Sequence, residues 1–367
     1  MDRGGKESRL ADVLRRLDRR RYEPFLGVLH GGRLLAELDG VGARPRLARF
    51  SGDPVAALRT LRLARDVRPD VVWCVGHGLT SVLGLLAARR LGVPAVVSVH
   101  GLERPDERLF GSVARRLVRR AARVVILTET YRERLLAEGV RPEQLVVQPN
   151  GIELTRFGEP PPDRARGRRE LGADWPGPAL VHVGSLSPAK AQHVLLLALG
   201  RLRQERPDVG LVMVGDGPLR PRLERQIGEL ALGPFVRMLG ERPDVPRLLP
   251  LFDGFVLSSE IEACPNVAIE AMASKLPVVA TDAGGTREVV AHGETGYIVP
   301  VGDPDALAHA LTELLADPAR AAAMGEAGLR RARERFSLDR MVQERMRLFD
   351  EVVGPRTGSS AALRQAR

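Results

Sequence analysis

The sequence predicts an α/β protein with two doubly wound, Rossmann-like halves, each built on a parallel sheet. Short apolar runs alternate with helical patterns along most of the chain, which is typical of parallel strands buried beneath helices. The 367 residues exceed one ordinary hydrophobic core, so two domains are expected. Polar or Gly-containing turns follow the apolar runs. Ligands of such folds bind at the carboxyl ends of the strands, so these turns are where we expect the site.

Residues 1–157 form the expected first domain. An amphipathic helical pattern at residues 6–20 places Leu10, Val13 and Leu17 on one face. The expected strands are Glu23–Leu29, Asp70–Cys74, Pro94–Val99, Val124–Leu127 and Leu145–Val147. The expected helices between them include Ala56–Arg68, Thr80–Leu91 and one that carries Arg115, Arg116, Arg119, Arg120 and Arg123.

Residues 176–336 form the expected second domain, after a linker at 158–175 that is rich in Pro, Gly and Arg. A helix at 337–353 is expected to pack back towards the first domain, and the polar tail 354–367 is expected to be disordered. The expected strands are Ala179–Val183, Leu211–Val214, Val236–Leu239, Phe255–Leu257 and Val278–Ala280. The late helices are expected at Leu307–Leu315, Ala319–Arg335 and Leu338–Val353.

The composition indicates a soluble cytoplasmic protein. No stretch approaches the roughly 18 uncharged apolar residues of a membrane span, and the charged N-terminus does not resemble a signal peptide. Cys74 and Cys264 are far apart, and we expect both to be reduced. No Cys and His cluster has metal-ligand spacing, so no metal site is predicted.

The net positive charge of the chain comes entirely from its first half. Residues 1–160 hold 29 basic and 19 acidic side chains, whereas the remainder holds 27 of each. This imbalance favours an acidic partner, such as peripheral contact with an anionic membrane surface. Nucleic acid is disfavoured, because three Tyr and two Trp offer little base stacking. Only three lysines occur beside 53 arginines, so each lysine is informative.

Two glutamates in the stretch 258–279 define the main candidate site. Glu262 follows an apolar run, and Glu270 lies on a helix that is expected to begin near Pro265. The N–H groups of that helix start would suit a phosphate, and Glu270 could accept hydroxyl hydrogen bonds about a turn and a half further on. This pairing suits a nucleotide sugar. Spacing alone leaves open an ordinary helix with solvated acids.

No Gly-x-Gly-x-x-Gly follows a strand, which disfavours a nicotinamide or flavin enzyme. A different ordered set of segments runs from about residue 70 to residue 300. They are VSVHGLE, VVQPNGIELTRF, HVGSLSPAKAQHVLLLAL, LVMVGDGPLRPRLE, VRMLGERPDVPRLLPLFDGFVLSS, EIEACPNVAIEAMA, LPVVATDAGGTREVV and GETGYIVP. Together these segments resemble glycosyltransferase family 4, whose members have the GT-B fold and retain anomeric configuration.

The resemblance implies a nucleotide-sugar site in the second domain. Glu270 matches the acid that binds the ribose hydroxyls, Glu262 the acid near the sugar, and Lys190 the cation that neutralises the diphosphate leaving group. Backbone groups that line the sugar and diphosphate are implied at Cys264, Pro265, Asn266 and Val267.

Further positions follow from the same resemblance. Gly215 and Gly217 would lie near the nucleotide and Arg242 near the base. In the first domain, His100 matches a histidine that faces the cleft from the acceptor side, and Gly4-Gly5 resembles a glycine loop that approaches the diphosphate.

The chain also departs from the family pattern. Ser185 stands where the family usually has an Arg that contacts the diphosphate, and Gly is usual where Ala191, Ala263 and Lys275 stand. The family's first strand normally precedes the Gly-Gly loop, but only Met1-Asp2-Arg3 does here. We therefore expect either a natural start upstream, which we favour, or a first sheet without its central strand.

The sequence therefore predicts a cytoplasmic GT-B glycosyltransferase, located partly at the inner face of the membrane. It would move a sugar from a nucleoside diphosphate to the hydroxyl of a lipid-linked or glycan acceptor, with retention and without cofactor or metal, in cell-envelope or exopolysaccharide synthesis. The alternatives are a decayed, non-catalytic sugar-nucleotide binding protein and a sugar-nucleotide epimerase of the same fold.

Overall fold

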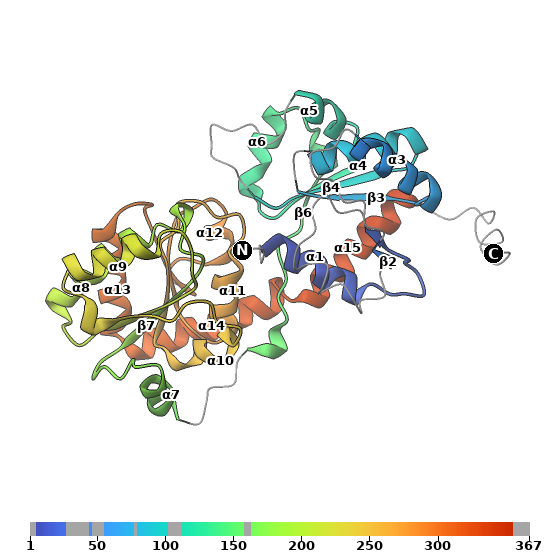
Figure 1. Cartoon of the computed structure of the whole chain (residues 1–367). Helices are drawn as coiled ribbons and strands as arrows, with labels where there is room; N and C mark the ends of the chain where they lie inside the picture. The colour runs from blue at the N-terminus through green and yellow to red at the C-terminus, as the bar shows by residue number, and fades with distance from the viewer. Residues whose placement is uncertain are drawn as a thin grey trace. The chain divides into compact units, whose positions relative to one another are not determined.

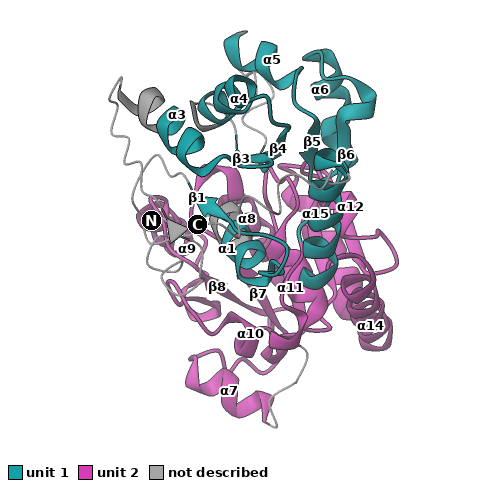
Figure 2. Ribbon diagram, turned by 90° about the vertical axis from the view of Figure 1, so that its right-hand side faces the viewer, with its two compact units in different colours: residues 1–150, 338–367 teal, residues 151–337 magenta. Residues whose placement is uncertain are grey.

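The computed structural model describes residues 5–26, 44–45, 55–76, 79–101, 112–157 and 163–354. The chain divides into two compact units, which are coloured separately in Figure 2. Unit 1 comprises residues 1–150 and 338–367, and unit 2 comprises residues 151–337. Gly4, the C-terminal part of the expected strand Glu23–Leu29, part of the expected linker, and residues 355–367 of the expected tail lie outside the described residues.

Unit 1 contains a four-stranded parallel sheet in the order β3-β4-β5-β6 and a separate two-stranded pair, β1-β2. The strands are β1 (Phe25–Leu26), β2 (Arg44–Pro45), β3 (Val72–Val75), β4 (Ala95–Val99), β5 (Arg123–Ile126) and β6 (Leu145–Val147). The helices are α1 (Gly5–Arg16), α3 (Val55–Val67), α4 (Leu79–Leu91), α5 (Ser112–Val118), α6 (Arg132–Ala137) and α15 (Leu338–Val353).

Helices cover both faces of the unit 1 sheet. Helix α4 contacts α3, α5, β3 and β4, and this layer lies on the side of the sheet away from α1 and α15 in Figure 1. Leu348 and Phe349 of α15 pack on Val96 and Val125 of the sheet. The alternating valines of the strands thus supply an apolar face, and the amphipathic helix α15 buries it.

Unit 2 is a doubly wound domain with a six-stranded parallel sheet in the order β12-β11-β10-β7-β8-β9. Helices α8, α9 and α13 form one layer and α11 and α14 contact each other in the other, as Figure 1 shows. The strands are β7 (Ala179–Val183), β8 (Gly210–Val214), β9 (Val236–Met238), β10 (Gly254–Leu257), β11 (Val278–Thr281) and β12 (Gly296–Val299). The helices are α7 (Arg164–Glu170), α8 (Gln192–Glu205), α9 (Arg220–Glu229), α10 (Val245–Leu248), α11 (Asn266–Ala273), α12 (Thr286–Val289), α13 (Pro304–Ala316) and α14 (Pro318–Arg335).

The two-domain, parallel-sheet α/β prediction is confirmed, but three local expectations are wrong and one strand was missed. The expected linker 158–175 contains α7, whose Arg164 and Arg168 pair with Asp253 of unit 2. The strand β12 was missed, although its run Gly-Tyr-Ile-Val is apolar and wholly buried. The last two expectations concern arginines. Helix α5 ends at Val118 and α1 at Arg16, so Arg119, Arg120 and Arg123, like Arg19 and Arg20, lie beyond the helices that were expected to carry them.

Candidate active site

The strand order of unit 2 places the candidate site where β7 and β10 lie side by side. From β7 the sheet grows outwards through β8 and β9, and then resumes on the other side of β7 with β10. This reversal is a topological switch point, where the loops at the carboxyl ends of neighbouring strands diverge and leave room for a ligand. Lys190 follows β7 and Glu262 follows β10, so the fold brings these two predicted residues together.

Lys190 stands at the end of a single turn of 3-10 helix, Pro188–Lys190. The hydroxyl of Ser258 donates to the carbonyl of Lys190 at 3.0 Å, and the amide of Glu260 donates to the carbonyl of Ala189 at 2.9 Å. The loop after β7 is therefore fixed to the loop after β10. These bonds hold the backbone of Lys190 but leave its four-carbon side chain to reach its own partner.

That partner is Glu262, which is only 8% exposed. Nζ of Lys190 lies 2.5 Å from Oε1 of Glu262, and the hydroxyl of Ser259 donates to the same oxygen at 2.7 Å. The carbonyl of Ser259 in turn accepts from Oγ1 of Thr281 at 2.6 Å. The site thus contains a partly buried ion pair whose carboxylate is anchored by a hydroxyl.

The backbone of Glu262 is fixed from the loop after β11. The amide of Gly285 donates to its carbonyl at 3.1 Å. Gly284 has φ +51°, and a Cβ there would come within 2.0 Å of the same carbonyl oxygen. The glycine is therefore required both by its conformation and by the close approach of the two loops.

Helix α11 begins directly after this loop, as the sequence predicts. Pro265 is its N-cap and provides no side-chain hydrogen bond, so the first N–H groups of α11 have no capping acceptor from it. Oδ1 of Asn266 is buried there with no hydrogen-bond partner among the described residues. Glu270 lies half-buried further along α11. The positive end of a helix, beside a lysine, can accept an anion.

Two predicted glycines allow the loops after β7 and β8 to pack together. A Cβ on Gly215 would lie 2.0 Å from the carbonyl oxygen of Gly184, and one on Gly217 would lie 2.5 Å from that of Leu186. Arg242 follows β9 and forms a two-pronged ion pair with Asp244, at 2.8 and 2.7 Å. This pairing lowers the pKa of Asp244 and raises that of Arg242.

Ser185 is exposed at the rim of the site, with its hydroxyl 3.2 Å from that of Ser187. Beneath it lie two residues that sequence reasoning missed. Nε2 of Gln192 donates to the carbonyl of Ser185 at 2.8 Å, and it lies 3.3 Å from Nε2 of His182. Nδ1 of His182 donates to the carbonyl of Val256 at 3.0 Å. Burial lowers the pKa of His182 to about 4, so the ring is neutral at pH 7.

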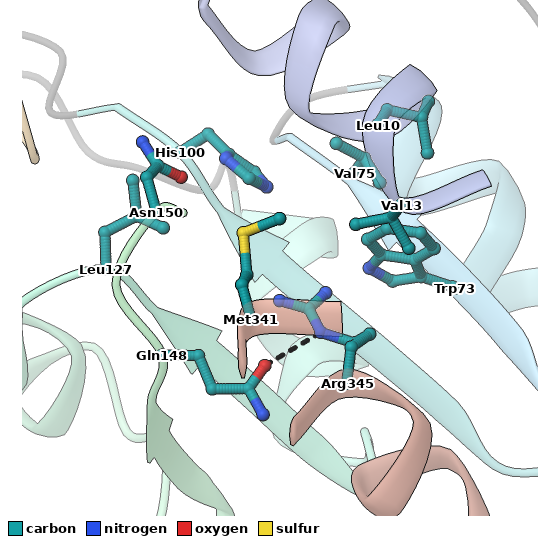
Figure 3. Close-up of a pocket in the computed structure, with 10 residues that line it drawn as sticks. All are labelled: Leu10, Val13, Trp73, Val75, His100, Leu127, Gln148, Asn150, Met341 and Arg345. Atoms are coloured by element: carbon teal, nitrogen blue, oxygen red, sulfur yellow. Dashed lines mark hydrogen bonds between the residues drawn. The ribbon is translucent and has the colours of Figure 1, made fainter. Parts of the chain in front are cut away.

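The remaining predicted site residues, His100 and Gly5, belong to unit 1. Gly5 is the first residue of α1, and His100 follows β4. His100 lines a small pocket within unit 1, together with residues at the carboxyl ends of β3, β5 and β6 and on α1 and α15 (Figure 3).

Arg345 of α15 also faces this pocket and is 3% exposed. Its guanidinium donates to Gln148 at 2.8 Å and to Ser98 at 2.7 Å, and it lies 4.8 Å from the centre of the Trp73 ring. Burial lowers the pKa of Arg345 to about 10. Sequence reasoning missed this residue, although an Arg among the apolar positions of an amphipathic helix was a signal for it.

The described residues include no group of three or more His, Cys, Asp or Glu that could hold a metal ion. None of their helices combines the length and the apolar character needed to cross a membrane.

Comparisons with known proteins identify the family of the chain. Residues 3–156 match the family model described as Glycosyltransferase Family 4, and residues 163–331 match that of Glycosyl transferases group 1. A GDP-mannose-dependent alpha-(1-6)-phosphatidylinositol monomannoside mannosyltransferase of Mycolicibacterium smegmatis is 34% identical over 289 residues, 75% of each chain. An alpha-D-kanosaminyltransferase of Streptomyces kanamyceticus is 30% identical over 273 residues, 70% of each.

Solved structures give the same result. The crystal structure of Anabaena Alr3699/HepE in complex with UDP superposes with a TM-score of 0.85 at 26% identity, covering 95% of this chain and 96% of that one. The same protein was also solved with UDP-glucose, and that structure matches with a TM-score of 0.83 at 26% identity over the same shares of the two chains. The chain therefore belongs to glycosyltransferase family 4, and it is a GT-B glycosyltransferase with a nucleotide-sugar donor.

Proposed function

We propose that this enzyme transfers a hexose from a nucleoside-diphosphate sugar to an acceptor hydroxyl with retention of configuration. The observation that carries the proposal is the meeting of Lys190, Glu262 and the N-terminus of α11 at the switch point of the unit 2 sheet. A cation and a helix N-terminus suit a diphosphate, and carboxylates suit the hydroxyls of ribose and sugar.

Each proposed role combines what the family resemblance implies with the chemistry of the group. Lys190 and the first amides of α11 stabilise the negative charge that develops on the departing diphosphate, which is the largest electrostatic demand of the step. Glu270 accepts the ribose hydroxyls, and Glu262 accepts hydroxyls of the sugar. Gly215, Gly217 and Arg242 lie on the loops after β8 and β9, where the nucleotide and its base would bind. His100 serves the acceptor side.

Retention requires the new bond to form on the face that the diphosphate leaves. The bond between the anomeric carbon and the phosphate oxygen breaks, and the acceptor oxygen bonds to the same face of that carbon. The acceptor's proton passes to the departing phosphate oxygen. Lys190 and the α11 amides supply the positive charge for this step.

The relatives suggest which substrates to try. One is named for GDP-mannose and a phosphatidylinositol mannoside, and another was crystallised with UDP-glucose. We propose a lipid-linked or glycan acceptor, in cell-envelope or exopolysaccharide synthesis. The base of the donor differs between these relatives, so both UDP- and GDP-sugars belong in the test.

The test measures release of nucleoside diphosphate from a panel of UDP- and GDP-sugars, with and without candidate acceptors. We expect acceptor-dependent release, and Lys190→Ala should lower turnover about a hundredfold, as loss of one preorganised stabilising group does. Lys275→Ala is the matched control, because Lys275 is an exposed partner of Glu326. Binding without turnover would favour a non-catalytic binding protein, and acceptor-independent isomerisation of the sugar would favour an epimerase.

A further inference from the structure

The ion pair between Lys190 and Glu262 sets two anions in competition for one ammonium. Nζ of Lys190 is bonded to Oε1 of Glu262, and no other hydrogen bond is made by Nζ among the described residues. The proposed function assigns the same nitrogen to the diphosphate. The ammonium has three donors but occupies one position, so a diphosphate that draws it away must offset the weakening of this pair.

The lysine is the partner that can move. The Glu262 carboxylate is anchored by the hydroxyl of Ser259, and its backbone carbonyl is held by the amide of Gly285. The backbone of Lys190 is equally fixed, but its side chain is a flexible four-carbon stem that ends in three rotatable donors. Exchange of partners therefore requires only rotation of the lysine side chain.

Release of Lys190 is costly to Glu262 unless another donor replaces it. The carboxylate is 8% exposed, and a largely buried charge that loses its counter-ion is strongly destabilised. A sugar hydroxyl can replace the ammonium as the donor. A nucleoside diphosphate that has lost the transferred sugar keeps only its ribose hydroxyls, which the proposed function assigns to Glu270.

We propose that Glu262 is an internal competitor that favours release of the nucleoside-diphosphate product. This inference rests on the proposed function. While the sugar is attached to the donor, its hydroxyls satisfy Glu262 and Lys190 pairs with the diphosphate. When the sugar has passed to the acceptor, Glu262 takes Lys190 back, and the diphosphate loses its cation. Glu262 thereby distinguishes donor from product through the lysine.

The proposal predicts that removal of the Glu262 charge strengthens binding of the nucleoside-diphosphate product. Glu262→Gln removes the carboxylate charge that holds Lys190. Nucleoside diphosphate should then bind about tenfold more tightly, which corresponds to the free energy of one charge-assisted hydrogen bond. The nucleotide sugar should gain less or bind more weakly, because Gln is the poorer acceptor for its hydroxyls. Product inhibition should become correspondingly stronger.

The experiment titrates UDP and GDP by calorimetry into four proteins: the unaltered enzyme, Glu262→Gln, Lys190→Ala and the double variant. Competition for the lysine predicts that Glu262→Gln tightens binding in the Lys190 background and changes it less than twofold in the Lys190→Ala background. Glu260→Gln is the matched control, because Glu260 is an exposed carboxylate of the same loop, and we expect no change. Glu262→Ala repeats the cycle without a side chain that could still bond to Ser259, and thermal melting checks that each protein is folded.

Each outcome separates this inference from the function on which it rests. If Glu262→Gln and Glu262→Ala bind the diphosphate equally or more weakly, the competition is refuted, while a weaker Lys190→Ala still supports the donor site. Equal tightening with and without Lys190 would mean plain repulsion between Glu262 and the ligand, and it also refutes the inference. If the unaltered enzyme binds neither UDP nor GDP, the proposed donor site fails and the inference fails with it.

Discussion

Single buried residues set the geometry of the loop after β7, residues 184–191. His182 lies wholly inside unit 2, donates to Val256 and contacts Gln192, which holds the carbonyl of Ser185. Within the loop 184–191, Lys190 is the sole basic residue. Ser185 brings no second cation to this loop, and the buried hydroxyl of Ser258 holds the backbone of Lys190.

The buried histidine predicts a pH dependence of stability. The pKa of His182 is about 4 in the folded protein, against about 6.5 when unfolded. The unfolded state therefore takes up a proton first as pH falls, and stability is lost between pH 6.5 and pH 4. Linkage gives a loss of about 2 kcal/mol between pH 7 and pH 5 from this residue.

Chemical denaturation at the two pH values measures this loss, with His182→Asn as the comparison. The Asn amide can still donate to Val256, but it does not titrate. We expect the drop in unfolding free energy between pH 7 and pH 5 to be smaller in the variant by about 2 kcal/mol. Equal drops in both proteins would exclude His182 as the titrating group.

Among the elements, the turn of 3-10 helix Pro188–Lys190 and helix α11 are each followed by a residue in a left-handed conformation. Ala191 and Lys275 both have positive φ, +44° and +60°. The left-handed conformation costs a non-glycine residue about 1–2 kcal/mol. The backbone at these two positions is therefore strained.

Lys275→Gly should therefore stabilise the protein, by about 1 kcal/mol after the greater freedom of glycine in the unfolded chain is subtracted. The lost ion pair with Glu326 is exposed and contributes little. Ala263→Gly is the matched control. Ala263 is not among the residues with positive φ, so this change should destabilise by about 0.5–1 kcal/mol. Denaturant unfolding measures both, and a loss of stability in Lys275→Gly would contradict the strain argument.

Helix α15 shows how an element far along the chain completes an earlier unit. Its apolar face contacts α1 and covers the unit 1 sheet, and Arg345 reaches Ser98 and Gln148 from that face. The buried guanidinium is hydrogen-bonded to neutral acceptors and lies over the face of Trp73. These contacts offset the cost of removing its charge from water.

The charge of the whole molecule points to a surface partner of unit 1. All of the net positive charge lies in residues 1–160. The arginines at the end of α1 mostly pair internally, since Arg16 contacts Asp339 and Arg15 contacts Asp12. Arg116 and Arg120 near α5 are exposed, and Val113 beside them is 61% exposed. An exposed apolar residue beside exposed arginines suits the surface of an anionic bilayer.

Co-sedimentation with liposomes of increasing anionic lipid content tests this contact. We expect binding that grows with lipid charge and falls in roughly 0.5 M salt, where screening is short-ranged. Reversing Arg116 and Arg120 to Glu should abolish it, because each arginine near an anionic surface contributes about 1 kcal/mol. The control reverses Arg222 and Arg225, which are exposed on α9 of unit 2. Binding that is insensitive to lipid charge, or lost equally in both variants, would refute a contact through Arg116 and Arg120.

The sequence by itself determined the fold class, the family and the content of the donor loops. Apolar strand runs and turn residues are local signals, so β7, β8, β10 and the start of α11 were predictable within a residue or two. Lys190, Glu262 and Glu270 stand out because their segments resemble a family pattern, not because any periodicity reveals their contacts.

Only the tertiary structure decided which of these residues meet. Lys190 and Glu262 are 72 positions apart, and Arg345 and Gln148 are 197 apart. Such pairs depend on the strand order of a sheet and on the face that a distant helix buries, which local sequence does not encode. The ion pair at the switch point, the neutral buried His182 and the buried Arg345 all follow from desolvation and packing, and these exist only once the chain has folded.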